Sequence, residues 1–177
     1  LYYCETIEAT NPCGEQPLPP YGACLLGSFN LTKYVTEGSF DFSLFTGDIH
    51  HVVRAMDNVI DRTIYPLEEQ EKEAKNKRRM GLGVTGLANA GELCGMPYAS
   101  EDFMKFTTKV LKTLRDHTYG ASALLAKEKG SFPLYDKEKY MAGKFFKTLS
   151  GWVQDQVKDN GLRNSHLTSI APTGTIS

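Results

Sequence analysis

A cysteine stands between an amide and a carboxylate near the start of the chain, in the run Asn11-Pro12-Cys13-Gly14-Glu15. In an extended segment the side chains at i, i+2 and i+4 point to one face, so Asn11, Cys13 and Glu15 are predicted to address one substrate together. An amide orients a hydroxyl group, a carboxylate accepts its proton, and a thiol carries out redox or radical chemistry. The alternative is an ordinary packed cysteine, because free cysteines are commonly buried for packing alone.

Longer blocks of sequence surround this triplet and carry a family resemblance. Residues 8–18 (EATNPCGEQPL) are followed by residues 21–31 (YGACLLGSFNL), which contain Cys24. Three further blocks follow in order, MDNVID at 56–61, RRMGLGVTGL at 78–87 and APTGTIS at 171–177. Together these blocks resemble the catalytic large subunit of ribonucleotide reductases, and they look most like its adenosylcobalamin-dependent class. The resemblance spans nearly the whole chain.

The resemblance implies roles for individual residues. Cys13 would carry a transient thiyl radical that abstracts the 3′ hydrogen of a ribonucleotide, Glu15 would be the general base for the 3′ hydroxyl, and Asn11 would hold the sugar in register. Cys24 would be one of two thiols that supply the reducing electrons, with its partner outside this chain. Phosphate binding would fall to the motif at the end of the sequence, that is, to Pro172, Thr173, Gly174, Thr175 and Ser177. Taken alone, that motif is also consistent with an ordinary threonine-rich turn.

The resemblance also implies cofactors and partners. The radical would come from adenosylcobalamin or, as the alternative, from a separate metal-containing subunit. An external dithiol, such as a thioredoxin-like protein, would restore the reduced thiols, and the substrate would be a ribonucleoside di- or triphosphate. No metal site is predicted in the chain itself, because its four cysteines lack paired metal-ligand spacing. The adjacent His50 and His51 would point about 100° apart on a helix.

A second glycine-rich motif offers a different function. Gly81, Gly83 and Gly86 satisfy the pattern G-x-G-x-x-G, which in the right context marks a dinucleotide-binding fold. That fold requires a hydrophobic strand before the first glycine, but residues 75–80 read KNKRRM. The sequence therefore favours a strand or helix start with close backbone packing here. A nucleotide-binding or structural module remains the alternative to a reductase.

Composition and length describe the kind of protein. The chain has 177 residues, 41% of them hydrophobic and 23% charged, which is typical of a soluble globular domain. The net charge of −1 provides no basic field for binding nucleic acid, and no apolar run is long enough to cross a membrane. A cytoplasmic location is expected. Both ends look truncated, so residues 1–177 are predicted to be a single segment of a larger catalytic domain, inactive without the remaining parts of the catalytic chain.

The expected elements alternate between strands and helices, which predicts an α/β fold. Strands are expected near residues 2–7, 23–31 and 165–170, with a turn-rich connector over 33–45. Helices are expected from Asp48 to about Tyr65, as a solvated stretch over 68–79, from Ser100 to Lys129, and over 135–150 and 151–159. The family resemblance further implies part of a ten-stranded α/β barrel with Cys13 on a loop inside it.

Overall fold

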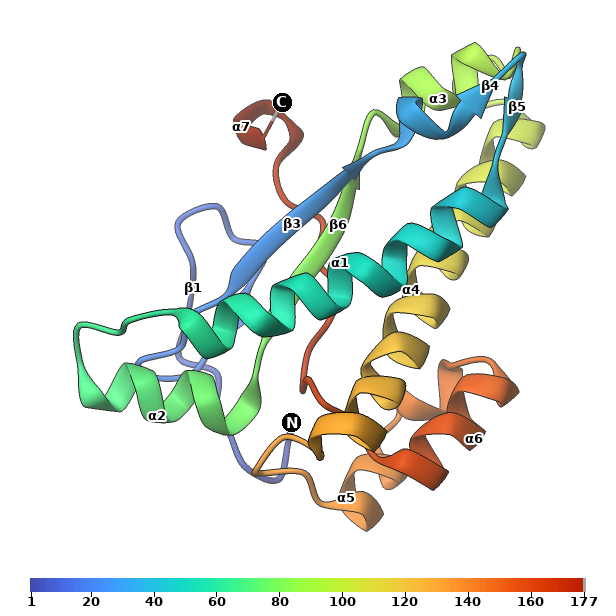
Figure 1. Ribbon diagram of the computed structural model, residues 1–177. Coiled ribbons are helices and arrows are strands. Elements are labelled where there is room, and N and C mark those ends of the chain that lie inside the picture. Colours follow the sequence, from blue (N-terminus) through green and yellow to red (C-terminus); the bar gives the residue numbers. More distant parts are fainter. Residues whose placement is uncertain (177) are drawn as a thin grey trace.

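The structure is a computed structural model that describes residues 1–176 of the chain. Two longer strands lie side by side near its centre, and long helices run beside them (Figure 1). The strands are β1 Ala9–Thr10, β2 Pro17–Leu18, β3 Leu25–Asn30, β4 Val35–Thr36, β5 Ser39–Phe40 and β6 Met80–Thr85. The α-helices are α1 Phe42–Arg62, α2 Glu68–Lys77, α3 Leu87–Leu93, α4 Glu101–Lys129, α5 Lys137–Ala142, α6 Gly151–Asn160 and α7 Thr173–Ile176. Two short 3₁₀-helices are η1 Leu31–Tyr34 and η2 Phe146–Thr148.

The central sheet is parallel. Strand β3 pairs with β6 in register, with Leu25 opposite Met80 and Asn30 opposite Thr85. Parallel neighbours need a long crossover connection, and here it contains α1 and α2. The predicted α/β class is confirmed by this arrangement, but the strands of residues 1–176 form no closed barrel.

The other edge of β6 is lined by residues 165–170, where a strand was expected. The Met80 amide donates to the His166 carbonyl at 2.9 Å, and the Leu82 amide donates to the Leu167 carbonyl at 2.8 Å. Only one isolated parallel bridge forms there, between Leu82 and Thr168. The expected strand is therefore an extended segment that follows β6 without a regular ladder.

Helix α1 begins earlier than its apolar pattern predicted. Asp41, not Asp48, caps it, because the Asp41 carboxylate accepts a hydrogen bond from the Leu44 amide at 2.9 Å. Asp48 instead accepts a hydrogen bond from the Tyr34 hydroxyl at 2.9 Å. The connector predicted over 33–45 thus contains η1, the β4–β5 hairpin and the first helical turn. At the other end α1 stops at Arg62, three residues before the expected end.

The strand expected near residues 2–7 is also wrong, since residues 1–8 form a turn and irregular backbone before the short strand β1. By contrast, the helix predicted from Ser100 to Lys129 is confirmed as α4. The Ser100 hydroxyl accepts a hydrogen bond from the Phe103 amide at 3.2 Å, and Gly130 follows the last helical residue with a φ of 82°. The helices expected over 135–150 and 151–159 are present as α5, η2 and α6.

The core lies where α1 and α4 pack against each other and against β6. In α1 the buried residues repeat every three or four positions, which places them on one face of the helix. Strand β6 is buried along almost its whole length, as expected for a strand covered on both faces. Fully buried side chains of this core include Phe45, Ile49, Val53, Met80, Leu82 and Val110. No helix within residues 1–176 has the length and apolar character needed to cross a bilayer.

Candidate functional site

The cysteine of the opening triplet lies at the tip of a hairpin formed by β1 and β2. Thr10 pairs with Pro17, and the Asn11 amide donates to the Gln16 carbonyl at 3.1 Å. The Asn11 side chain closes the loop as well, because its Oδ1 accepts a hydrogen bond from the Gln16 amide at 3.1 Å. Gly14 has a φ of 82°, a backbone conformation that suits glycine. The loop is therefore a tight turn, and the extended backbone assumed for residues 11–15 is wrong.

Cys13 and Glu15 have different environments within this turn. The Cys13 side chain is free and exposed, so a reactant can reach it. The Glu15 side chain is half-buried, and its Oε2 atom is buried without a hydrogen-bond partner among the described residues. Buried polar atoms are normally paired, so an unpaired carboxylate oxygen is a candidate acceptor for a hydroxyl group brought by a substrate.

The hairpin is fastened to the central sheet at several points. Gln16 is buried, and its amide nitrogen lies over Gly81 of β6, where a Cβ atom would approach it to 2.7 Å. The Ser169 hydroxyl donates a hydrogen bond to the Glu15 carbonyl at 3.1 Å. Glycine at position 81 and serine at position 169 therefore let the hairpin loop lie directly against β6 and the extended segment beside it.

Cys24 lies just before β3, on a cavity of about 180 Å³ that Arg79 also lines. Burial raises the pKa of the Cys24 thiol to about 12, the positive charge of Arg79 acts to lower it, and the negative charge of Glu15 acts to raise it. Cys24 and Glu15 thus interact electrostatically, although they come from different elements. The structure brings the predicted redox thiol into the neighbourhood of the predicted base.

The predicted phosphate motif lies at the far end of the same extended segment. Ala171 is buried, Pro172 is half-buried, and Thr173 and Gly174 are exposed at the start of α7. Thr173 follows Ser169 by four residues, a distance of at most about 14 Å along the chain. The motif is therefore within reach of the hairpin, whereas Ser177 lies outside the described residues and Thr175 is placed only by its backbone in α7.

The glycines of the G-x-G-x-x-G pattern have a packing role. Gly81 and Gly83 lie inside β6, not in a loop after a strand. A Cβ atom on Gly83 would collide with the Ser169 carbonyl oxygen, and Gly86 adopts a φ of 69° where it caps α3. The backbone of residues 169–170 therefore packs directly against Gly83. The dinucleotide-binding alternative is wrong for this loop, and the expected close backbone packing is confirmed.

A cluster of buried ion pairs contacts the hairpin, and it was not predicted from the sequence. Glu5 Oε2 accepts from Arg79 at 2.7 Å and from Lys77 at 3.0 Å, and His166 Nε2 lies 3.3 Å from Glu5 Oε1. Burial alone would raise the pKa of Glu5, but its hydrogen bonds and the surrounding positive charges outweigh burial and hold that pKa well below its usual range. Arg79 also donates to the Pro17 carbonyl of β2 at 3.4 Å.

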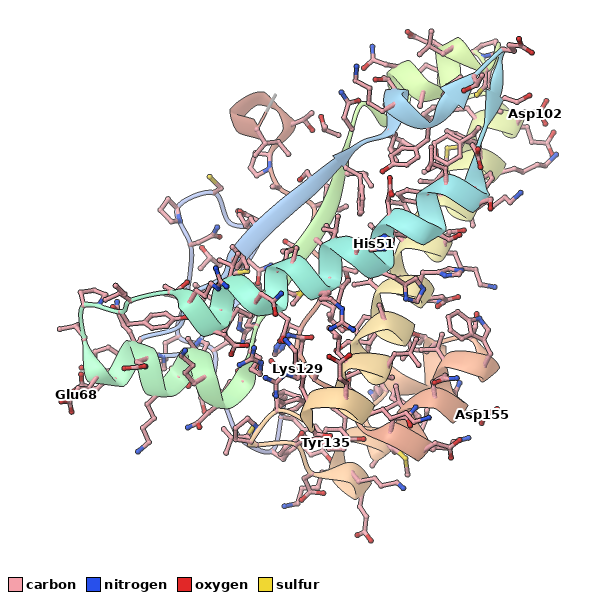
Figure 2. All side chains as sticks on the ribbon, in the orientation of Figure 1. His51, Glu68, Asp102, Lys129, Tyr135 and Asp155 are labelled. Carbon is pink, nitrogen blue, oxygen red and sulfur yellow. The ribbon has the colours of Figure 1, made fainter. Side chains whose placement is uncertain are left out.

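A second buried cluster centres on Asp57 of α1. Its carboxylate accepts hydrogen bonds from Arg78 at 2.7 Å and from Asn164 at 3.0 Å. Lys129, labelled in Figure 2, reaches it from the end of α4 at 3.2 Å, and Arg163 reaches it at 3.3 Å. The cluster ties together α1, α4, Arg78 at the end of α2 and the chain leading to residues 165–170. Its contacts join these elements into one frame.

The basic run before β6 gave the only local signal for both clusters. Lys77, Arg78 and Arg79 were predicted to lie on a solvated stretch, and α2 is indeed short and mostly polar. All three of these basic residues are nevertheless buried. In the sequence, two arginines directly precede an almost wholly apolar strand. Side chains beside such a strand have little access to solvent.

Comparisons with known proteins show which family the chain is similar to. Residues 2–177 match the family model described as "Ribonucleotide reductase, barrel domain". The chain is 40% identical over 172 residues to a vitamin B12-dependent ribonucleoside-diphosphate reductase of Thermoplasma acidophilum, covering 97% of this chain and 20% of that relative. A reductase of the same name from Mycobacterium tuberculosis is 37% identical over 171 residues, covering 97% of this chain and 22% of the relative.

The chain is also similar to a relative of another name. The ribonucleoside-diphosphate reductase subunit alpha of Chlamydia pneumoniae is 31% identical over 176 residues, covering 87% of this chain and 17% of the relative. The chain thus spans about a fifth of the length of the curated relatives it matches. Because the family model covers nearly every residue, the chain belongs to the barrel-domain family of ribonucleotide reductases.

Proposed function

We propose that this chain contributes the radical-bearing loop of an enzyme that reduces ribonucleotides to deoxyribonucleotides. Cys13 carries the thiyl radical and takes the 3′ hydrogen atom of the substrate ribose. Glu15 accepts the 3′ hydroxyl proton, which assists loss of the 2′ hydroxyl as water. Asn11 keeps the loop closed and contributes to positioning the sugar, and Cys24 with a second thiol supplies the two reducing electrons.

One observation carries the proposal: the loop with the exposed thiol is held against the segment that leads into the phosphate motif. The Ser169 hydroxyl donates to the Glu15 carbonyl at 3.1 Å, and Pro172, Thr173 and Gly174 follow within a few residues. A ribonucleotide whose phosphates contact the first turn of α7 therefore extends its ribose toward Cys13 and Glu15. The backbone amides of Gly174 and Thr175 and the hydroxyls of Thr173, Thr175 and Ser177 are the groups we assign to those phosphates.

The cofactor follows from the relatives and from the donor groups of the chain. Adenosylcobalamin supplies an initiating radical when it is bound, and the exposed Cys13 thiol is the group of this chain that receives it. Among residues 1–176 no three His, Cys, Asp or Glu side chains gather as metal ligands. A radical from a metal-containing subunit would reach the same thiol.

The remaining partners are assigned by their chemistry. The substrate is a ribonucleoside di- or triphosphate, and the rest of the catalytic chain completes the site. A thioredoxin-like dithiol protein returns Cys24 and its partner to the reduced state. Thiols that must be reduced in each cycle suit a reducing compartment, which places the enzyme in the cytoplasm.

The test uses the full reductase chain that carries this segment, supplied with adenosylcobalamin, a dithiol and ribonucleotides. Deoxyribonucleotide formation is measured by chromatography with Cys13→Ser, Glu15→Gln and the control Cys94→Ser. We expect Cys13→Ser to abolish product, Glu15→Gln to lower kcat about 10²-fold or more, and Cys94→Ser to retain activity. Product at an undiminished rate from Cys13→Ser would refute the radical assignment.

A further inference from the structure

Arg79 lines the cavity beside Cys24, and the proposed mechanism assigns this arginine no role. Cys24 and Arg79 line the same space of about 180 Å³, together with apolar side chains and Tyr65. The Arg79 side chain is only 4% exposed, so water screens its charge weakly. A thiol in such an apolar space strongly favours its protonated form, because burial penalises the thiolate.

Arg79 is held in place by an ion pair and by a backbone carbonyl. Its partner Glu5 is shared, because Lys77 contacts the same Oε2 atom at 3.0 Å. The second contact of Arg79 is the neutral Pro17 carbonyl at 3.4 Å. Lys77 also pairs with Glu73, so the two cations have two carboxylate partners. What Arg79 offers Cys24 is a paired but buried guanidinium that lines the same cavity. The half-buried Glu15, by contrast, contributes a negative charge that acts on Cys24.

We propose that Arg79 is a positioning residue for redox chemistry at Cys24, where its buried guanidinium stabilises the thiolate form of the sulfur. The inference deepens the proposed function, because it rests on Cys24 being one of the two reducing thiols. It assigns a chemical purpose to an arginine that also holds the hairpin through Pro17.

The step that benefits is reduction of the disulfide between Cys24 and its partner thiol by the external dithiol. A thiolate of the dithiol attacks the partner sulfur, a new S–S bond forms, and the Cys24 sulfur leaves with the electron pair as a thiolate. The second thiol of the reductant then displaces the partner sulfur. The reductant ends as a disulfide, and both cysteines end as thiols after each takes one proton. A cation beside Cys24 stabilises the leaving thiolate.

The direction of the change in Cys24 reactivity distinguishes an electrostatic role of Arg79 from a packing role. Removing the positive charge of Arg79 should make the Cys24 thiolate harder to form, whereas removing the negative charge of Glu15 should make it easier. Local loosening of the structure would instead expose the thiol in both variants and raise its reactivity in both. Tyr65 is the other titratable side chain on the cavity, and burial raises its pKa, so it stays neutral near pH 8.

The experiment measures the rate at which iodoacetamide alkylates Cys24 in the full reductase chain between pH 7 and pH 10, resolved from other cysteines by peptide mass spectrometry. We expect Arg79→Gln to slow alkylation at pH 8 about tenfold, the change that one pKa unit produces. Glu15→Gln should speed it, Arg79→Lys should stay within about threefold of the parent because the charge remains, and the rate at Cys94 should not change.

Faster or unchanged alkylation in Arg79→Gln would overturn the proposal. If Arg79→Gln does not fold, as judged by circular dichroism, Arg79→Lys becomes the test. A tenfold loss in the alkylation rate of Cys24 in that variant, which keeps the positive charge, would also overturn the proposal. The readout does not require turnover. Slower alkylation in Arg79→Gln within a chain that never forms deoxyribonucleotide would show the electrostatic effect of Arg79 on Cys24 while refuting the proposed function and, with it, the redox role. Deoxyribonucleotide formation together with unchanged alkylation in Arg79→Gln would refute only the role of Arg79.

Discussion

At the scale of single residues, the charge on which the frame depends most is that of Asp57. It is completely buried and is held by Arg78, Lys129, Arg163 and Asn164. Asp57→Asn leaves three buried or partly buried cations without their common anion, so we expect a loss of about 3–5 kcal/mol in the free energy of unfolding. Urea unfolding followed by circular dichroism measures it.

The control for that variant is Glu128→Gln, which breaks an ion pair with Arg54 whose two side chains are each about half exposed. Surface pairs contribute little, so its unfolding curve should overlay that of the parent protein. An Asp57→Asn protein as stable as this control would show that the buried cluster is not what holds the frame.

The same residue predicts how stability depends on pH. Burial would raise the pKa of Asp57, but its hydrogen bonds and charges from Arg78 and Arg163 outweigh burial and lower the pKa below the ordinary value of 3.8. A lowered folded-state pKa means that the unfolded chain binds the proton more tightly. The stabilisation from Asp57 is therefore present above about pH 4 and is lost as pH falls through the folded-state pKa. Unfolding free energies between pH 3 and pH 7 should fall more steeply toward acid in the parent protein than in Asp57→Asn.

At the scale of elements, the contact between β6 and residues 165–170 holds the loop and the phosphate motif in one frame. A Cβ atom on Gly83 would collide with the Ser169 carbonyl and lie 3.5 Å from the Ile170 Cα. Gly83→Ala should therefore push the segment away from β6 and lower the free energy of unfolding by about 1–3 kcal/mol, as other overpacked sites do. The matched control is Gly151→Ala at the start of α6, where a Cβ meets open space and no loss is expected. Equal stability of the two variants would mean that the segment is not held by close packing.

Elements defined by local signals were predictable from the sequence. Helix α4 has its cap at Ser100, acids in its first turn and Gly130 after its last residue, so both ends can be read within a few residues. The start of α1 was missed because its cap, Asp41, directly follows a short hairpin, although the buried repeat already begins at Phe45. Periodicity describes which face is buried, but it does not locate the first turn.

The candidate site was likewise predicted only in part from the sequence. The close packing of Gly81 and Gly83 was predicted from residue types, whereas the extended backbone assumed for residues 11–15 is a turn. Asn11 was assigned to a substrate, yet its side chain hydrogen-bonds the backbone of Gln16. The role of Arg79 depends on Glu5, 74 residues away in sequence, and spacing within one short motif carries no information about such a pair.

At the scale of the whole molecule, the described sheet is open. Within residues 1–176, β3 has β6 on one side and no strand on the other, and the extended segment 165–170 forms only one bridge with β6. An active site for a radical must exclude water and fix both the sugar and the loop, which needs walls on every side. Here the Cys13 side of the hairpin is exposed.

A polypeptide of these 177 residues alone is therefore expected to form no deoxyribonucleotide. The measurement mixes it with adenosylcobalamin, dithiothreitol and each ribonucleoside di- and triphosphate, and then separates the products by chromatography. The full reductase chain serves as the positive control under identical conditions. Product from the 177 residues alone, lost on Cys13→Ser, would show that this segment closes its own site and that the open sheet is no barrier to turnover. Absence of such product would support the proposal that the loop, the proposed base Glu15 and the proposed redox thiol Cys24 act only within a larger, enclosed site.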